Sequence, residues 1–251
     1  SAEEITINGF EYYVDTLVDS ELSTQFASKE KPYLVRALTN EAELFAIRET
    51  RRLQQKVHEI HVSGESYNFG TNQTYDYYYH LNAEYRHWLR SRFDTIAFGF
   101  GHLRGITNVL DAESEVGIDF GYAELGYRLS SWLAMRGKLS LGATKNVFSV
   151  GSGIKLEFGE ESKVIARIES QQDLGFVRGI ELNICSIPQF PLGFGIDLTN
   201  QPGDNISGER LYFRVGYESS PSLGFEVLAS YQARDTREEG IGGRVATVWR
   251  F

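Results

Sequence analysis

The chain has 251 residues, 41% of them hydrophobic, so it is long enough and apolar enough to bury a core and is not intrinsically disordered. Its net charge of -9 has the same sign as a phosphate backbone, which argues against a nucleic-acid partner. Aromatic residues make up 13%, and 25 glycines against 5 prolines favour β-structure.

The N-terminal part differs in pattern from the rest of the chain. Alternating apolar residues near its start indicate a short extended piece. Asn40 and Glu43 have the spacing of a helix capping box, and the apolar residues that follow predict an amphipathic helix over 41–55. The sequence therefore predicts an N-terminal segment, residues 1–55, that ends in a helix.

From residue 56 onwards, apolar residues recur at every second position, which is typical of β-strands with two different faces. A first short strand begins at His58. The apolar faces of later strands begin at Tyr75, Ile96, Val116, Leu133, Phe148, Val164, Ile180, Phe194, Leu211, Leu223 and Val245. Together these runs predict about twelve strands.

The run from Val116 illustrates how faces are assigned. Val116, Ile118, Phe120 and Tyr122 share one face, and Asp119 lies on the other. We expect the apolar side chains to point outward here and Asp119 to point inward.

Two architectures fit this alternation: a soluble β-sandwich, in which apolar faces pack on each other, and a transmembrane barrel, in which they face lipid. Tight connections such as RLSSW alternate with longer polar ones such as NQPGDNISGE, and aromatic residues gather near strand ends. Ten residues at about 3.3 Å each and a tilt near 40° span about 25 Å, the height of a membrane apolar band. The sequence predicts an all-β, antiparallel, up-and-down transmembrane barrel of about 12 strands over residues 56–251.

The C-terminal residues resemble the assembly signal of bacterial outer-membrane β-barrel proteins. In that signal a polar residue, a glycine, an aromatic or apolar residue and a terminal aromatic recur at the spacing of Arg244, Ala246, Trp249 and Phe251. Ala246 departs from the pattern, which usually has glycine. The resemblance implies a porin-like protein of the Gram-negative outer membrane and recognition by the barrel-assembly machinery. It also implies a periplasmic side for the tight turns, the C-terminus and residues 1–55.

The polar strand faces would line the lumen of such a barrel. The expected lumen-lining residues carry both signs: Asp119, Arg136, Lys138, Lys155, Glu157, Arg167, Glu169, Glu181, Asp197, Arg214, Glu226, Arg244 and Arg250. They either form a structural lattice of charges or line a narrow aqueous path. No cofactor is expected, and no metal site, because the histidines fall on different strands or faces.

An enzyme remains an alternative. Glu59, His61, Ser63 and Glu65 share one strand face, and a base beside a hydroxyl is the arrangement of an activated nucleophile. His61 and Ser63 loosely resemble the His-x-Ser pair of lipid A deacylase barrels, although the residues that follow that pair in the family are absent. An ordinary polar strand face explains the pattern equally simply, so no catalytic residue is expected.

The second predicted barrel strand carries several tyrosines on one face. Tyr75, Tyr77, Tyr79 and Tyr85 form an outward stripe, and a phenol in the membrane needs a partner. An oligomer interface would provide one, and so would a hairpin extending beyond the bilayer. The sequence thus predicts a porin-like or structural barrel without a reaction of its own. We expect it to be a homo-oligomer in contact with membrane lipid, and an oligomer that organises or encloses lipid is one form it could take.

Overall fold

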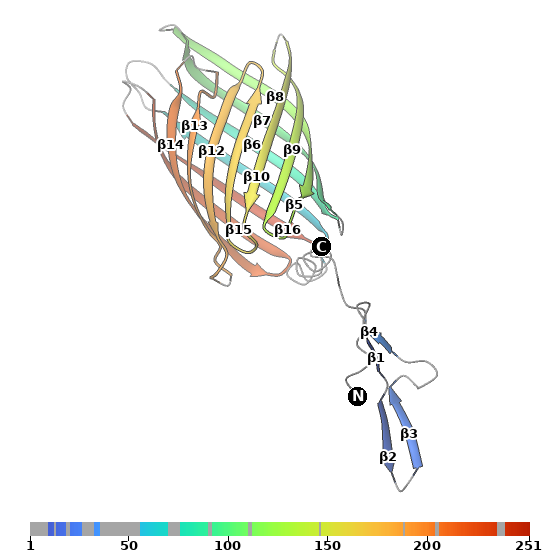
Figure 1. Ribbon diagram of the computed structural model, residues 1–251. Coiled ribbons are helices and arrows are strands. Elements are labelled where there is room, and N and C mark those ends of the chain that lie inside the picture. Colours follow the sequence, from blue (N-terminus) through green and yellow to red (C-terminus); the bar gives the residue numbers. More distant parts are fainter. Residues whose placement is uncertain are drawn as a thin grey trace.

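The computed structural model describes residues 10–12, 14–18, 21–26, 33–35, 56–69, 76–89, 92–109, 112–145, 147–187, 189–203, 206–234 and 239–251. Twelve strands form one closed antiparallel barrel (Figure 1). They are β5 (His58–Asn68), β6 (Tyr77–Trp88), β7 (Phe93–Val109), β8 (Ala112–Arg128), β9 (Leu133–Ala143), β10 (Phe148–Phe158), β11 (Lys163–Gln171), β12 (Gly175–Ile184), β13 (Leu192–Thr199), β14 (Gly208–Ser220), β15 (Leu223–Ala233) and β16 (Gly240–Arg250).

Each barrel strand pairs with the next one in the chain, and the last strand closes on the first. β16 pairs with β5 from Arg250 opposite Glu59 to Gly242 opposite Tyr67. Closure leaves no unpaired strand edge, which is the condition for a sheet to stand in lipid. The predicted all-β antiparallel barrel of twelve strands is therefore confirmed.

The N-terminal part contains four further strands: β1 (Phe10–Tyr12), β2 (Val14–Val18), β3 (Glu21–Phe26) and β4 (Tyr33–Val35). β1 pairs with β4 and β2 with β3, in two sheets separate from the barrel sheet. The described ranges contain no helix, so the helical part of the predicted fold is not observed in them. The helix predicted over 41–55 lies outside the described residues.

The barrel has two different rims. At one rim β5 begins and β16 ends, next to the connections 89–92, 129–132, 159–162, 185–191 and 221–222; we call it the C-terminal rim. At the opposite rim, the loop rim, the connections are 69–76, 110–111, 144–147, 172–174, 200–207 and 234–239. The predicted difference in loop length holds only in part, because 185–191 is longer than 110–111 or 172–174. Gly159 allows one tight turn, with φ +118° and its Cβ position 2.1 Å from the Ser162 carbonyl oxygen.

The wall of the barrel is inside out compared with a soluble protein. Large apolar side chains are exposed on the outer face of all twelve strands, and Leu139 and Leu141 reach 69% and 70% exposure. Charged side chains such as Glu124 and Arg136 are buried inside. This arrangement fits a lipid environment and is the reverse of a soluble β-sandwich, in which the apolar faces would pack together. Among the described residues, no helix is long and apolar enough to cross a membrane.

One face assignment from the sequence is wrong. Ile118 and Phe120 are 1% and 8% exposed and belong to an apolar cluster inside the barrel, so Asp119 points outward. The cluster sits toward the loop rim and consists of Tyr67, Phe69, Tyr78, Leu103, Ile118, Phe120 and Leu174. Glycines of β7 make room for it: a Cβ on Gly101 would lie 2.3 Å from the Phe120 ring. A ring laid over a glycine is the physical reason why this apolar face turns inward.

Candidate functional site in the barrel lumen

The lumen contains a cavity of about 560 Å³ that is lined by residues from all twelve barrel strands. A volume of this size falls within the range of about 300–1,000 Å³ seen for small-molecule sites. Most of its lining is charged or polar. Polar lining of this kind keeps a cavity hydrated, since water finds hydrogen-bond partners there.

The structure places the residues predicted for the lumen in three groups. Those that line the cavity are Lys138, Lys155, Arg167, Glu169, Arg214, Glu226, Arg244 and Arg250. Arg136, Glu157, Glu181 and Asp197 lie on the inner face and pair with other inner-face residues. Asp119 does not belong to the lumen. It lies on the outer face, where Arg104 contacts it at 2.7 Å and His102 at 2.5 Å.

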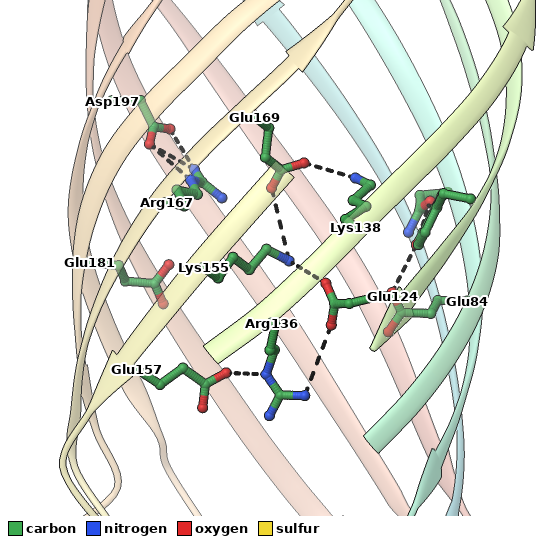
Figure 2. A network of polar contacts seen from close by, with 12 residues as sticks. Glu84, Glu124, Arg136, Lys138, Lys155, Glu157, Arg167, Glu169, Glu181 and Asp197 are labelled. Atoms are coloured by element: carbon green, nitrogen blue, oxygen red, sulfur yellow. Dashed lines mark hydrogen bonds and ion pairs between the residues drawn. The ribbon is translucent and has the colours of Figure 1, made fainter. Parts of the chain in front are cut away.

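Glu124 of β8 is the centre of the largest ion-pair network (Figure 2). Its side chain is 1% exposed, and its carboxylate lies 3.1 Å from Lys155 Nζ. The same carboxylate lies 3.5 Å from Arg86 Nη2 and 3.9 Å from Arg136 Nη1. One buried acid therefore holds three cations that come from β6, β9 and β10.

The network continues over neighbouring strands. Lys138 Nζ lies 2.8 Å from Glu169, which also lies 3.9 Å from Lys155 Nζ (Figure 2). Toward the C-terminal rim, Arg136 Nε donates a hydrogen bond to Glu157. Glu157 also accepts a hydrogen bond from Lys163 Nζ at 2.9 Å. We call this set, from Arg86 on β6 to Glu169 on β11, the β6–β11 network.

The other side of the barrel has its own pairs. Arg214 of β14 bridges Glu181 at 2.5 Å and Glu226 at 2.6 Å, and Arg244 of β16 also pairs with Glu226. We call these four residues the β12–β16 network. Between the two networks, Arg167 lies 2.7 Å from Asp197, which lies on β13 and also pairs with Arg210.

The direction of these pairs decides whether the lumen is blocked. Within each network the partners lie at most two strands apart in barrel order, whereas opposite walls of this barrel lie six strands apart. Among the described residues no ion pair reaches across the lumen; the longest step, Arg234 to Asp76, joins the ends of β15 and β6 at the loop rim. The charges thus lie along the wall and leave the cavity between them.

Apolar side chains fill part of the lumen toward the loop rim. Leu174, in the turn 172–174, is 4% exposed, lines the cavity and belongs to the apolar cluster that β5 to β8 supply from the opposite wall. Beside it, Asp76 and Arg234 form an ion pair of 2.8 Å with both side chains fully buried. The Arg234 guanidinium lies 4.1 Å from the Phe69 ring centroid and donates to the Gln201 carbonyl oxygen. Three connections are tied together at this rim.

Comparison with known proteins shows which solved structures share this fold. No protein-family model matches the chain, and no curated protein sequence matches it. Solved structures match in fold: the KdgM porin in complex with disordered oligogalacturonate has a TM-score of 0.54 and 10% identity, over 77% of this chain and 99% of that chain. The chain has the fold of an outer-membrane β-barrel. The translocator domain of the autotransporter NalP from Neisseria meningitidis is also similar, with a TM-score of 0.52 and 11% identity, over 83% of this chain and 96% of that chain.

The side chains of the enzyme alternative are not arranged as a catalytic set. His61 and Ser63 both line the cavity, but among the described contacts no hydrogen bond joins their side chains. Glu65 accepts from Tyr67 at 2.9 Å and contacts His80 at 3.3 Å, so it orients neither of them. No group of three or more metal-ligating side chains occurs in the described ranges.

The four residues that resemble an assembly signal lie at the seam where the barrel closes. Arg244 and Ala246 are on the inner face of β16, and Trp249 and Phe251 are about half exposed. The Phe251 ring lies 5.3 Å from the His58 ring and 5.0 Å from the Trp249 ring. Phe251 thus links the last strand of the barrel to the first.

Sequence reasoning missed several inner residues of this site, among them Glu124, Arg210 and Arg234. Parity was the available signal for Arg210, because it lies an even number of residues from Arg214. Glu124 has the parity of Phe120, which the local pattern predicts to be outward, so the wrong face of this strand also hid Glu124. Arg234 lies beyond the end of β15, where alternation no longer assigns a face.

Proposed function

We propose that this protein is a porin-like channel of the bacterial outer membrane that passes small polar solutes through a narrow lumen. The observation that carries the proposal is the wall itself: apolar side chains outside on every strand, and charges inside that pair along the wall around a cavity. Both signs of charge border the cavity, which favours small neutral or zwitterionic solutes over ions of one sign. The KdgM porin structure contains an acidic sugar chain, and the mixed charges here do not favour one.

Conductance tests the channel directly. In planar bilayers we expect stepwise conductance with weak ion selectivity, and a larger step for Leu174→Ala, because that change removes an apolar side chain from the lumen near the loop rim. Leu141→Ala, on the outer face at 70% exposure, is the matched control and should conduct as the unaltered protein does. If neither the unaltered protein nor Leu174→Ala conducted ions, a channel would be ruled out and a structural role would be left for the charge networks.

We also propose that Phe251 acts in barrel assembly, as its resemblance to the outer-membrane signal implies. Phe251→Ala removes the ring that packs against His58 and Trp249, and we expect it to lower the amount of heat-modifiable barrel in the membrane fraction. Phe148→Ala, at the loop rim and 84% exposed, is the control. Refolding of purified Phe251→Ala in detergent separates the two causes. A signal defect leaves refolding intact, and equal losses in cells and in detergent would argue against a signal.

Homo-oligomerisation through β6 is a further part of the proposal. Tyr77, Tyr79 and Tyr85 are exposed together with Leu81 on the outer face of this strand. The Tyr85 hydroxyl already bonds to His58 Nδ1 at 2.8 Å, whereas the Tyr79 hydroxyl on this lipid-facing surface would gain a partner in an interface between barrels. We expect the native particle in detergent to contain several chains and Tyr79→Leu to weaken it. A single chain per particle, measured by light scattering, would overturn this part.

A further inference from the structure

The outer face of the barrel has a groove of about 640 Å³ over β10, β11, β12 and β13. Its walls are the apolar side chains of Ile154, Leu156, Ile168, Ile180, Ile196 and Leu198. Strand pairing puts Ala166 between Leu156 on one side and Ile180 on the other. The small side chain of Ala166 between two large ones forms the floor of the groove.

One end of this groove is polar. In the row nearest the loop rim, Ser152 pairs with Ser170, and Ser170 pairs with Phe176. Both serines are exposed and are part of the groove lining. In the next row Arg178 lies between Ile168 and Leu198, and its side chain is exposed. The groove therefore runs from hydroxyls and a cation near the rim to aliphatic side chains below.

Arg178 is directed toward the loop rim. Its guanidinium carbon lies 4.9 Å from the centroid of the Phe176 ring, and Phe176 precedes it by two residues toward that rim. Arg178 is three residues from Gly175, where β12 begins, which at about 3.3 Å per residue and a tilt near 40° places it about 8 Å below the rim. A long cationic side chain at this depth reaches the headgroup layer of a bilayer.

The Arg178 guanidinium also lacks an ion-pair partner among the described residues. In the described part of the chain Arg178 forms no ion pair, whereas Arg104, the other arginine on the outer face near this rim, pairs with Asp119 at 2.7 Å. Guanidinium binds phosphate with directed hydrogen bonds, and hydroxyls add further donors. A second copy of the chain fits less well, because a two-fold contact over this groove would bring Arg178 toward its own equivalent.

We propose that this groove is a lipid-binding site: Arg178, with the hydroxyls of Ser152 and Ser170, holds the phosphate of a lipid headgroup, and one acyl chain lies along the aliphatic walls. The proposal rests on the outer-membrane location proposed above. It names a phosphate-bearing lipid of the leaflet at the loop rim as the occupant.

Native mass spectrometry of the detergent-refolded full chain, titrated with phosphatidylglycerol, tests this site. We expect one lipid to be retained, Arg178→Met to weaken its binding about tenfold or more, and Ala166→Phe, which fills the floor, to weaken it as well. Lys145→Met removes an exposed cation outside the groove and should change nothing. Diacylglycerol, which has the same acyl chains and no phosphate, should bind more weakly than phosphatidylglycerol.

Three outcomes would contradict the proposed lipid site. Unchanged lipid retention in both Arg178→Met and Ala166→Phe would show that the groove is not where lipid binds. Equal binding of the two lipids would exclude recognition of the phosphate, and a dimer abolished by Arg178→Met would put a second chain in the groove. Conductance of the same samples separates this inference from the proposed channel. Conductance without a retained lipid would contradict the lipid site alone. A retained lipid without conductance would contradict the channel alone.

Discussion

Arg234→Met is expected to lower the free energy of unfolding by about 3–5 kcal/mol, the usual cost of removing one partner from a buried ion pair. Asp76 and Arg234 lie 2.8 Å apart with both side chains at 0% exposure, so the carboxylate would lose its closest cation without gaining water. The guanidinium also packs on Phe69 and bonds to the connection at Gln201. Denaturant unfolding of the barrel in lipid vesicles measures the change.

Two controls make this result specific. Lys145 and Glu115 form a pair of 3.3 Å with side chains 87% and 78% exposed, and Lys145→Met should cost less than about 0.5 kcal/mol. The double variant Arg234→Met with Asp76→Asn should lose less than the sum of the single variants, because no buried charge remains. A loss below about 1 kcal/mol for Arg234→Met alone would show that the pair does not stabilise the loop rim.

Glu124→Gln is expected to shift the channel toward anions. The substitution keeps the shape of the side chain but removes the acid that lies 3.1 Å from Lys155, 3.5 Å from Arg86 and 3.9 Å from Arg136. The excess of cations over acids in the β6–β11 network then grows by one, which attracts anions. The reversal potential under a salt gradient measures the shift. Stability should also fall, by less than the about 3–5 kcal/mol of a fully buried pair, because Arg86 and Lys155 are only partly buried and all three cations keep another acid.

The same change of charge elsewhere serves as the control for Glu124→Gln. Glu115→Gln lies on the exposed loop-rim part of β8 and should leave the reversal potential unchanged. Adding Lys155→Met to Glu124→Gln restores the balance of charge and should move the reversal potential back. An unchanged reversal potential in Glu124→Gln would mean that ions do not pass the β6–β11 network.

Which face of a strand is outward could be predicted where the whole run was long and unambiguous. Along β9, Leu133, Leu139 and Leu141 alternate with Arg136 and Lys138, and the structure places the leucines outside. Along β8 the apolar stretch around Phe120 gave the wrong face, because the inward positions of this strand are apolar near Phe120 and charged further along. Glu124 and Arg128 share the inward parity of Phe120, and Leu125 is outward. Parity read over all of β8 would have corrected the assignment of Asp119.

The ion-pair partners could not be predicted at all. Lys155 is 31 residues from Glu124, and Arg234 is 158 residues from Asp76. Their contacts depend on the strand register and on the curvature of the closed sheet, which no local pattern contains. The same is true of Leu174, which packs with side chains from the opposite wall only after the barrel has closed.

Alternation with period two is a local property of the backbone, so the sequence by itself determined the strand content of residues 56–251, the number of barrel strands and the antiparallel up-and-down order. Tertiary structure alone decided which charges meet, where apolar side chains fill the lumen and that the apolar face of β8 turns inward around Phe120. It also decided that Arg178 stands above an aliphatic groove. These features depend on distances between strands that lie far apart in the chain, and such distances exist only once β16 has closed on β5.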